Sequence, residues 1–182
     1  MKISVVGFDP SMTGWGIATA QLDLATGHLD TPVLTVVEPD KPTNKQVRVN
    51  SVDLDVAQQL AKAAIKHTKG AKVVFVEVPV GSQSAAGMKS YGMCVGILGS
   101  LRAEGVHLIE VTATEVKVAL SGDKNATKKS MIAAARGLYP DALFPTYHGK
   151  ITNKAEHVAD AIGAIHAGVN TAVFQNLLKL YA

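Results

Sequence analysis

The stretch ISVVGFDPSMTGWGIA, residues 3–18, decides which fold the rest of the sequence can adopt. Its first apolar run predicts a buried strand whose end presents Asp9. Gly14 and Gly16 indicate a turn, and a second strand follows it. A third strand is expected at about residues 29–37. The N-terminal third therefore predicts three antiparallel strands.

Strands and helices alternate in the remainder of the chain. After a loop that contains Pro39, Pro42 and Asn44, apolar residues at helical spacing predict a long helix over residues 49–68. Two apolar, β-branched segments predict a fourth strand at 72–78 and a fifth at 107–111. Further helical segments are expected at residues 84–101, 112–120, 127–138, 153–167 and 173–181. We therefore expect an α/β fold in which helices flank a mixed five-stranded sheet.

The composition is that of one globular domain and names no function by itself. With 182 residues, 47% of them hydrophobic, we expect a single domain over residues 1–182. Cys94 is the only cysteine, which excludes an intramolecular disulfide and favours a reducing, cytoplasmic setting. We identify no secretory signal and no apolar segment near the ~20 residues that span a bilayer, so we expect no membrane partner. The net charge of +3 is weak support for nucleic acid binding.

Three acidic residues occupy positions that one fold can bring together. Asp9 and Glu77 lie near the ends of the first and fourth predicted strands, and Asp160 lies on the last long helix. His157 shares a helix face with Asp160, and Glu156 is a competing ligand. Clustered carboxylates repel one another unless cations neutralise them, and oxygen ligands suit Mg²⁺ or Mn²⁺. Each residue alone has an ordinary explanation, but together they predict two-metal phosphodiester hydrolysis.

Lysines gather after the predicted fifth strand. Lys117, Lys124, Lys128 and Lys129 fall within thirteen residues and form the best candidate phosphate-binding strip, which Lys89 would extend. By itself, such a run of lysines is more often a solvated helix face than a nucleic-acid-binding strip. Only its nearness to a phosphodiesterase centre would favour DNA.

Two other segments are notable. Gly92, Gly96 and Gly99 lie on related faces of the helix predicted at 84–101, which fits either a tight internal contact or a dimer interface. The irregular segment 140–152 contains Tyr147, His148 and Lys150, which we expect near the substrate.

At several of these places the sequence resembles RuvC-type Holliday-junction resolvases of the ribonuclease H-like superfamily. VGFDPS followed by TGWGI, within residues 6–17, resembles the first motif, and Phe75-Val76-Glu77 with its downstream glycines resembles the second. HVADAI, at 157–162, resembles the C-terminal motif, whose first metal-binding group is aspartate in some members and histidine in others. Val116-Lys117 and Lys129-Ser130 match places where the family has DNA-contacting lysines. The resemblance covers nearly the whole chain in the right order.

The resemblance implies a homodimer that binds four-way junctions in branched DNA and nicks two strands symmetrically, leaving ligatable 5′-phosphate ends. It implies catalytic and metal-binding roles for Asp9, Glu77, His157 and Asp160, with two Mg²⁺ ions per active site, for which Mn²⁺ can substitute. Val80 is a departure, because many cellular members have an aromatic side chain there that would wedge the junction open. Such divergent members are common in phages, so we expect the cytoplasm of a bacterium or of a phage-infected host cell.

Other functions fit parts of the same pattern. Another nuclease of this fold would cut flaps, replication forks or RNA/DNA hybrids by the same metal chemistry. A non-catalytic junction-binding protein would not need Asp9, Glu77 and Asp160 together. An actin-like phosphotransferase also begins with a strand, an aspartate and a glycine turn, but it needs a second domain and phosphate loops.

Overall fold

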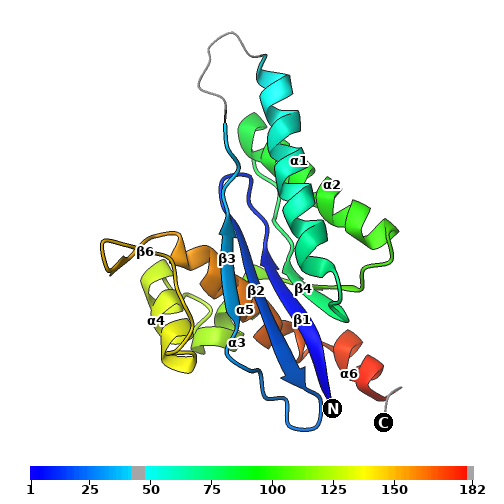
Figure 1. Ribbon diagram of the computed structural model, residues 1–182, viewed down its shortest axis with the longest axis vertical. Helices are drawn as coiled ribbons and strands as arrows, with labels where there is room; N and C mark the ends of the chain where they lie inside the picture. Colours follow the sequence, from blue (N-terminus) through cyan, green and yellow to red (C-terminus); the bar gives the residue numbers. More distant parts are fainter. Residues whose placement is uncertain (42–47, 180–182) are drawn as a thin grey trace.

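A five-stranded mixed sheet organises the computed structural model, which describes residues 1–41 and 48–179 (Figure 1). The strand order is β3-β2-β1-β4-β5. The strands are β1 (Lys2–Asp9), β2 (Trp15–Asp23), β3 (Val33–Val37), β4 (Val73–Glu77) and β5 (Leu108–Val111). β2 is antiparallel to both of its neighbours, β1 and β3, whereas β4 runs parallel to both β1 and β5. The expected mixed α/β sheet is confirmed.

Helices cover both faces of this sheet. Helices α1 (Val49–Thr68) and α2 (Ala85–Ala103) pack on one face against Phe8, Trp15 and Val76. Phe75 and Val5 point to the opposite face, because successive side chains of a strand alternate. The helices on that face are α3 (Ala113–Ser121), α4 (Lys128–Leu138), α5 (Ala155–Gly168) and α6 (Ala172–Lys179).

Most helix boundaries follow from local signals in the sequence. Ser84, Thr112 and Thr127, the first residues of three predicted helical segments, each accept a backbone N–H hydrogen bond and cap the helix that begins at the next residue. At Thr112 the Glu115 side chain completes a capping box. The part of the expected loop at Pro42 and Asn44 and the end of the last predicted segment at 180–181 lie outside the described residues.

Two expectations about the strands were wrong. The third strand begins at Val33 and not near Leu29, which forms only an isolated bridge to Leu22. Pro32 precedes the strand, and a proline has no N–H to continue a ladder. The segment 140–152 is not irregular throughout, because it contains the hairpin β6 (Thr146–Tyr147) and β7 (Lys150–Ile151). The two-residue connection is a turn signal that periodicity alone does not detect.

Helix α5 is the most deeply buried helix, and glycines in the strands let it approach. A Cβ atom added at Gly7 would lie 1.9 Å from the carbonyl oxygen of Ala161, and one at Gly16 would lie 2.0 Å from that of His157. Real Cβ atoms do not come so close to backbone oxygens, so only glycine fits at either position. The glycines of α2 differ: Cβ atoms at Gly92, Gly96 and Gly99 would meet nothing within 4 Å. A tight internal contact is therefore not their explanation.

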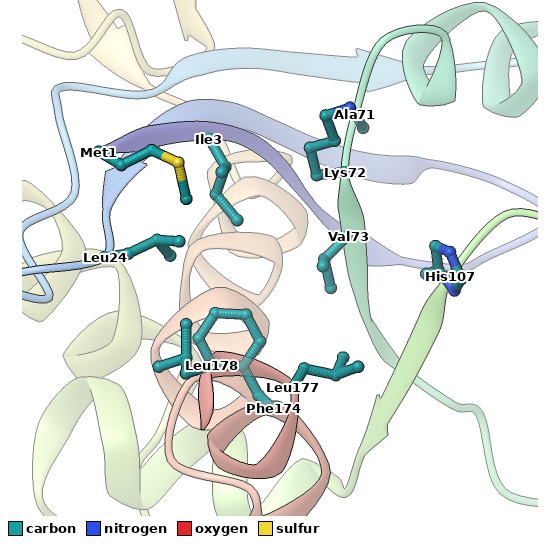
Figure 2. A pocket seen from close by; sticks show the side chains of 10 residues that line it. All are labelled: Met1, Ile3, Leu24, Ala71, Lys72, Val73, His107, Phe174, Leu177 and Leu178. Carbon is teal, nitrogen blue, oxygen red and sulfur yellow. The ribbon is translucent and has the colours of Figure 1, made fainter. Parts of the chain in front are cut away.

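A large cavity lies at the opposite end of the sheet from Asp9. It measures about 520 Å³ and is lined by residues at the beginnings of β1 and β4, including Ile3 and Val73. Figure 2 shows Phe174 of α6 beneath these strands, beside Leu177 and Leu178. Because β1 and β4 are parallel, Asp9 and Glu77 lie at their far ends, and this cavity is separate from the acidic residues.

We expect Gly16→Ala to destabilise the fold, because its methyl group would collide with the backbone of α5. Overpacking of this kind costs about 1–3 kcal/mol or more. Gly137→Ala is the matched control, because a Cβ there meets nothing and α4 should gain about 0.5–1 kcal/mol. Urea unfolding measures both, and equal stabilities for the two variants would contradict the packing of α5 on β2.

Candidate nuclease site

Asp9 and Glu77 lie at the neighbouring carboxyl ends of two parallel strands. The register pairs Phe8 with Val76, so the two acidic residues occupy the next positions along β1 and β4. Adjacent strands are about 4.8 Å apart, and residues in the same register point to the same face. The side chains of Phe8 and Val76 face α1 and α2, so Asp9 and Glu77 belong to the face that α5 covers.

Helix α5 brings His157 and Asp160 to these strand ends. The His157 ring lies against Gly14, where an added Cβ would be 3.1 Å from Nε2. Its Nδ1 is 2.7 Å from Oδ2 of Asp9, a contact between residues 148 positions apart in the sequence. Asp160 follows on the same helix face, three residues later. The structure thus assembles the four residues that the sequence singled out.

The carboxylates of this cluster affect one another. Burial raises the pKa of Asp160 to about 8, and the charges of Asp9 and Glu77 add to the effect. Burial likewise raises the pKa of Glu77 to about 7, with Asp9 adding to it and Lys117 opposing it. The pKa of Asp9 is raised by burial, against the lowering effect of its hydrogen bond with His157. Buried like charges that raise one another's pKa values are typical of functional sites.

His157 partly neutralises the cluster. Its hydrogen bond to Asp9 raises the imidazole pKa, and burial opposes this shift. A protonated ring donates its Nδ1 hydrogen to the Asp9 carboxylate. One carboxylate of the cluster therefore has a positive partner within the chain.

Glu156 points to a different partner. Its carboxylate forms an ion pair with Lys128 of α4, with the Nζ and Oε2 atoms 2.8 Å apart. The Glu156 side chain is 19% exposed, against 77% for Lys128, so the lysine reaches in from the surface. Glu156 is nevertheless close enough to raise the pKa values of Asp9, Glu77 and Asp160. This helix turn therefore presents a second, lysine-bound carboxylate beside the cluster.

The other lysines differ in position. Lys117 is half-buried on α3, and its charge lowers the pKa of Glu77, so it lies close to that carboxylate. Lys124 and Lys129 are exposed, in the α3–α4 connection and at the start of α4. Lys89 belongs to α2, where its Nζ atom contacts both carboxylate oxygens of Asp53 at 2.9 Å. The strip expected from the sequence therefore consists of one group along α3 and α4 and a separate residue on α2.

The donor set fits a hard divalent cation, but the side chains as placed do not form a closed ligand shell. Among residues 1–41 and 48–179, no three Asp, Glu, His or Cys side chains are arranged to hold one ion. The bond from His157 to Asp9 occupies one of the expected oxygen ligands. Carboxylate oxygens are the ligands that Mg²⁺ prefers, and a cation would offset the burial and the repulsion that raise the pKa values of Glu77 and Asp160.

A cleft lined with hydroxyl groups adjoins the acidic cluster. The cleft measures about 280 Å³, and Pro10 and Pro79 are among its lining residues. Pro10 directly follows β1, and Pro79 lies two positions after the end of β4. The hydroxyl-bearing residues that line it are Ser11, Thr13, Ser82, Ser90 and Tyr91. None of these residues is among the site residues expected from the sequence. The signal that was available is the clustering of serine and threonine just after two acidic strand ends.

Comparisons with known proteins support the fold. No protein-family model matches the chain, and a search of curated proteins found no match. Among solved structures, the chain is similar to RuvC of T. thermophilus in complex with Holliday junction substrate, with a TM-score of 0.61, 20% identity and 96% of each chain covered. A second structure, of Thermus thermophilus RuvC, matches with a TM-score of 0.61 and 20% identity over 97% of each chain. The chain therefore has the RuvC type of ribonuclease H-like fold.

The raised carboxylate pKa values predict a protein that loses stability as the pH rises. Asp160 ordinarily titrates near 3.8 and here near 8, so the folded state binds its proton more tightly than the unfolded state. Its favourable contribution is present at low pH and disappears between about pH 4 and 8. In chelator at pH 8.5, we expect Asp160→Asn to raise the Tm by roughly 4–8 °C, equivalent to about 2 kcal/mol.

The control for this prediction is Asp141→Asn, because Asp141 is exposed and outside the cluster. Thermal unfolding at pH 5 and pH 8.5, with chelator and with Mg²⁺, compares the variants. Mg²⁺ should stabilise the wild type at pH 8.5 more than it stabilises Asp160→Asn. A wild-type pH profile in Asp160→Asn would contradict the raised pKa.

Proposed function

We propose that this protein is a metal-dependent, structure-specific DNA endonuclease that resolves four-way junctions by paired phosphodiester hydrolysis. The observation that carries this proposal is the meeting of Asp9, Glu77 and the His157–Asp160 face of α5 at one end of the sheet. The similar fold of a RuvC bound to Holliday junction substrate supports branched DNA as the ligand.

The proposed chemistry assigns a role to each residue of the cluster. Asp9, Glu77 and Asp160 supply oxygen ligands for two Mg²⁺ ions, for which Mn²⁺ substitutes. Divalent ions, when bound, supply an activated water and stabilise the charge on the leaving 3′ oxygen. His157 orients Asp9 through Nδ1 and is the fourth group at the site. The burial of these side chains limits access of bulk water and strengthens their interaction with a cation.

DNA would cross the site between lysines and hydroxyl groups. Lys117 and Lys128 lie beside the carboxylates, and the exposed Lys124 and Lys129 continue from them along α3 and α4. The hydroxyl-lined cleft is reached from the same strand ends. Both kinds of group bind phosphate oxygens without reading bases, which fits recognition by shape. Lys89 would contribute at the outer side of α2 after release from Asp53.

We expect Asp9→Asn, Glu77→Gln and Asp160→Asn each to lower cleavage of a synthetic four-way junction by well over tenfold, because each removes a proposed metal ligand. A tenfold loss is about 1.4 kcal/mol of barrier, and a smaller loss would contradict the role. Binding measured in Ca²⁺ should remain. His157→Asp should keep measurable activity, and His157→Ala should lose more.

The cleavage assay also separates the alternative functions. The protein is offered four-way, flap, fork and RNA/DNA hybrid substrates together, and cleavage of each is measured in Mg²⁺, in Mn²⁺ and in chelator. Asp141→Asn is the control variant. Preference for flaps, forks or hybrids would identify a different nuclease of this fold, and binding without any cleavage would identify a junction-binding protein. Glu156→Gln should retain more activity than Asp160→Asn, because Glu156 is paired with Lys128.

Symmetric cleavage of two strands calls for two copies of the chain, and we propose that they meet through α1 and α2. A groove of about 470 Å³ runs between these helices, with Leu54, Ile65 and Gly96 among its lining residues. Leu54 is 70% exposed and Ile65 is 47% exposed. The open glycine positions of α2 would allow a second copy to approach closely.

We expect Gly96→Arg to convert a dimer into a monomer, because it places a charged, bulky side chain in this groove. Gly137→Arg is the matched control, since Gly137 is also an exposed helical glycine with open space around it. Sedimentation velocity measures the oligomeric state, and a junction labelled on both strand pairs measures paired cleavage. A dimeric Gly96→Arg variant would contradict the proposed interface.

A further inference from the structure

The hairpin β6–β7 is a small, ordered projection. Thr146 pairs with Ile151 and Tyr147 with Lys150, and the base is closed by the backbone N–H of Thr152, which donates to the carbonyl of Pro145. Figure 1 shows the hairpin extending away from the sheet, beyond α4. It therefore stands out from the body of the molecule while its base is held in place.

The turn of the hairpin has a demanding backbone conformation. His148 has φ 48° and is the one non-glycine residue with positive φ among the described residues, and Gly149 follows with φ 75°. Positive φ at both central residues is what a two-residue type I′ turn requires, and asparagine or glycine is usual at the first. Histidine, like asparagine and aspartate, adopts positive φ more readily than most non-glycine residues, so the turn accommodates His148.

The tip of the hairpin presents two aromatic rings to solvent. The side chain of Tyr147 is 70% exposed. Within residues 1–41 and 48–179, every other Phe, Tyr or Trp residue is buried or partly buried. Its ring packs edge-to-face against His148, with the centroids 4.1 Å apart. Phe144, at the near end of the same segment, is buried in the core. The fold thus uses one aromatic of this segment for packing and leaves the other free.

The hairpin leads directly into the helix that carries the site. Thr152 ends it, and α5 begins at Ala155, two residues before His157. Lys154, at the start of α5, is held by an ion pair with Glu38. The rises of a strand and a helix put the tip within about 25 Å of His157. One DNA strand extends about 3.4 Å per nucleotide, so the tip lies within about seven nucleotides of a phosphate that is bound at the site.

We infer that the tip of this hairpin is a base-stacking element, in which the Tyr147 ring contacts the face of a nucleobase left unpaired near the branch point. The inference rests on the proposed function for the identity of DNA as the ligand. Base–aromatic stacking needs an exposed ring on a supported backbone, and the hairpin supplies both. Lys150, which pairs with Tyr147, contributes a charge for the adjacent phosphate.

The test uses four-way junctions that carry 2-aminopurine at single positions up to seven nucleotides from the branch. The full-length protein binds them in Ca²⁺, and a 2-aminopurine-labelled single strand serves as a second ligand. We expect the wild type and Tyr147→Phe to change the fluorescence at one or more positions. Tyr147→Ala and Tyr147→Leu should abolish that change and weaken binding about tenfold. Leu143→Ala is the control, because Leu143 is an 88% exposed aliphatic side chain before the same hairpin.

Each outcome decides the inference. Wild-type fluorescence and affinity in Tyr147→Ala would overturn it, and so would wild-type behaviour of Tyr147→Leu, because apolar bulk would then suffice. A Tm lowered by more than about 4 °C in Tyr147→Ala would indicate a structural role and would also overturn it. If the wild type binds DNA but cleaves none, the proposed nuclease function fails while the fluorescence still decides the role of the hairpin. Failure to bind either DNA would overturn both.

Discussion

The close approach of α5 to β1 and β2 is the contact on which the rest of the structure depends. The helix backbone touches the sheet at Gly7 and Gly16, where no side chain larger than hydrogen fits. Because the helix is held at this short distance, the imidazole of His157 reaches Asp9 directly. The same contact buries most of α5 and joins the core of the sheet to the site. The packing of the core and the geometry of the site therefore both depend on the short distance between α5 and the sheet.

The site has a cost in stability that the fold must offset. Asp9, Glu77 and Asp160 are placed in a half-buried setting where their charges are poorly solvated and mutually repulsive. His157 and Lys128 relieve part of this repulsion, one through Asp9 and the other through Glu156. Such an arrangement favours the protonated form of some of the carboxyl groups, which is the physical meaning of their raised pKa values.

The surface features of the molecule lie in different parts of the fold. Lysines of α3 and α4 lie on one side of the carboxylates, and the hydroxyl-lined cleft adjoins the strand ends. The exposed apolar groove between α1 and α2 belongs to the opposite face of the sheet. The cavity of about 520 Å³ lies away from the site, under the beginnings of β1 and β4. No helix of the described residues has the length and apolar character of a membrane span.

The sequence by itself determined the features that depend on local pattern. Strand and helix periodicity predicted the order of elements and helical segments that begin at Ser84, Thr112 and Thr127, which the structure shows to be N-caps. The spacing of His157 and Asp160 predicted one shared helix face. The resemblance of short motifs predicted the fold type. These features are readable because a repeating backbone relates neighbouring residues in a fixed way.

Only the tertiary structure decided which side chains meet across elements. The Asp9–His157 hydrogen bond, the Glu156–Lys128 ion pair and the open face of the α2 glycines join or separate residues that no local spacing relates. The shortened third strand and the hairpin tip at Tyr147 were missed for a similar reason, because single residues in turns and edges override periodicity. Local pattern specifies the direction of a side chain along its own element, whereas the packing of helix on sheet selects its partner.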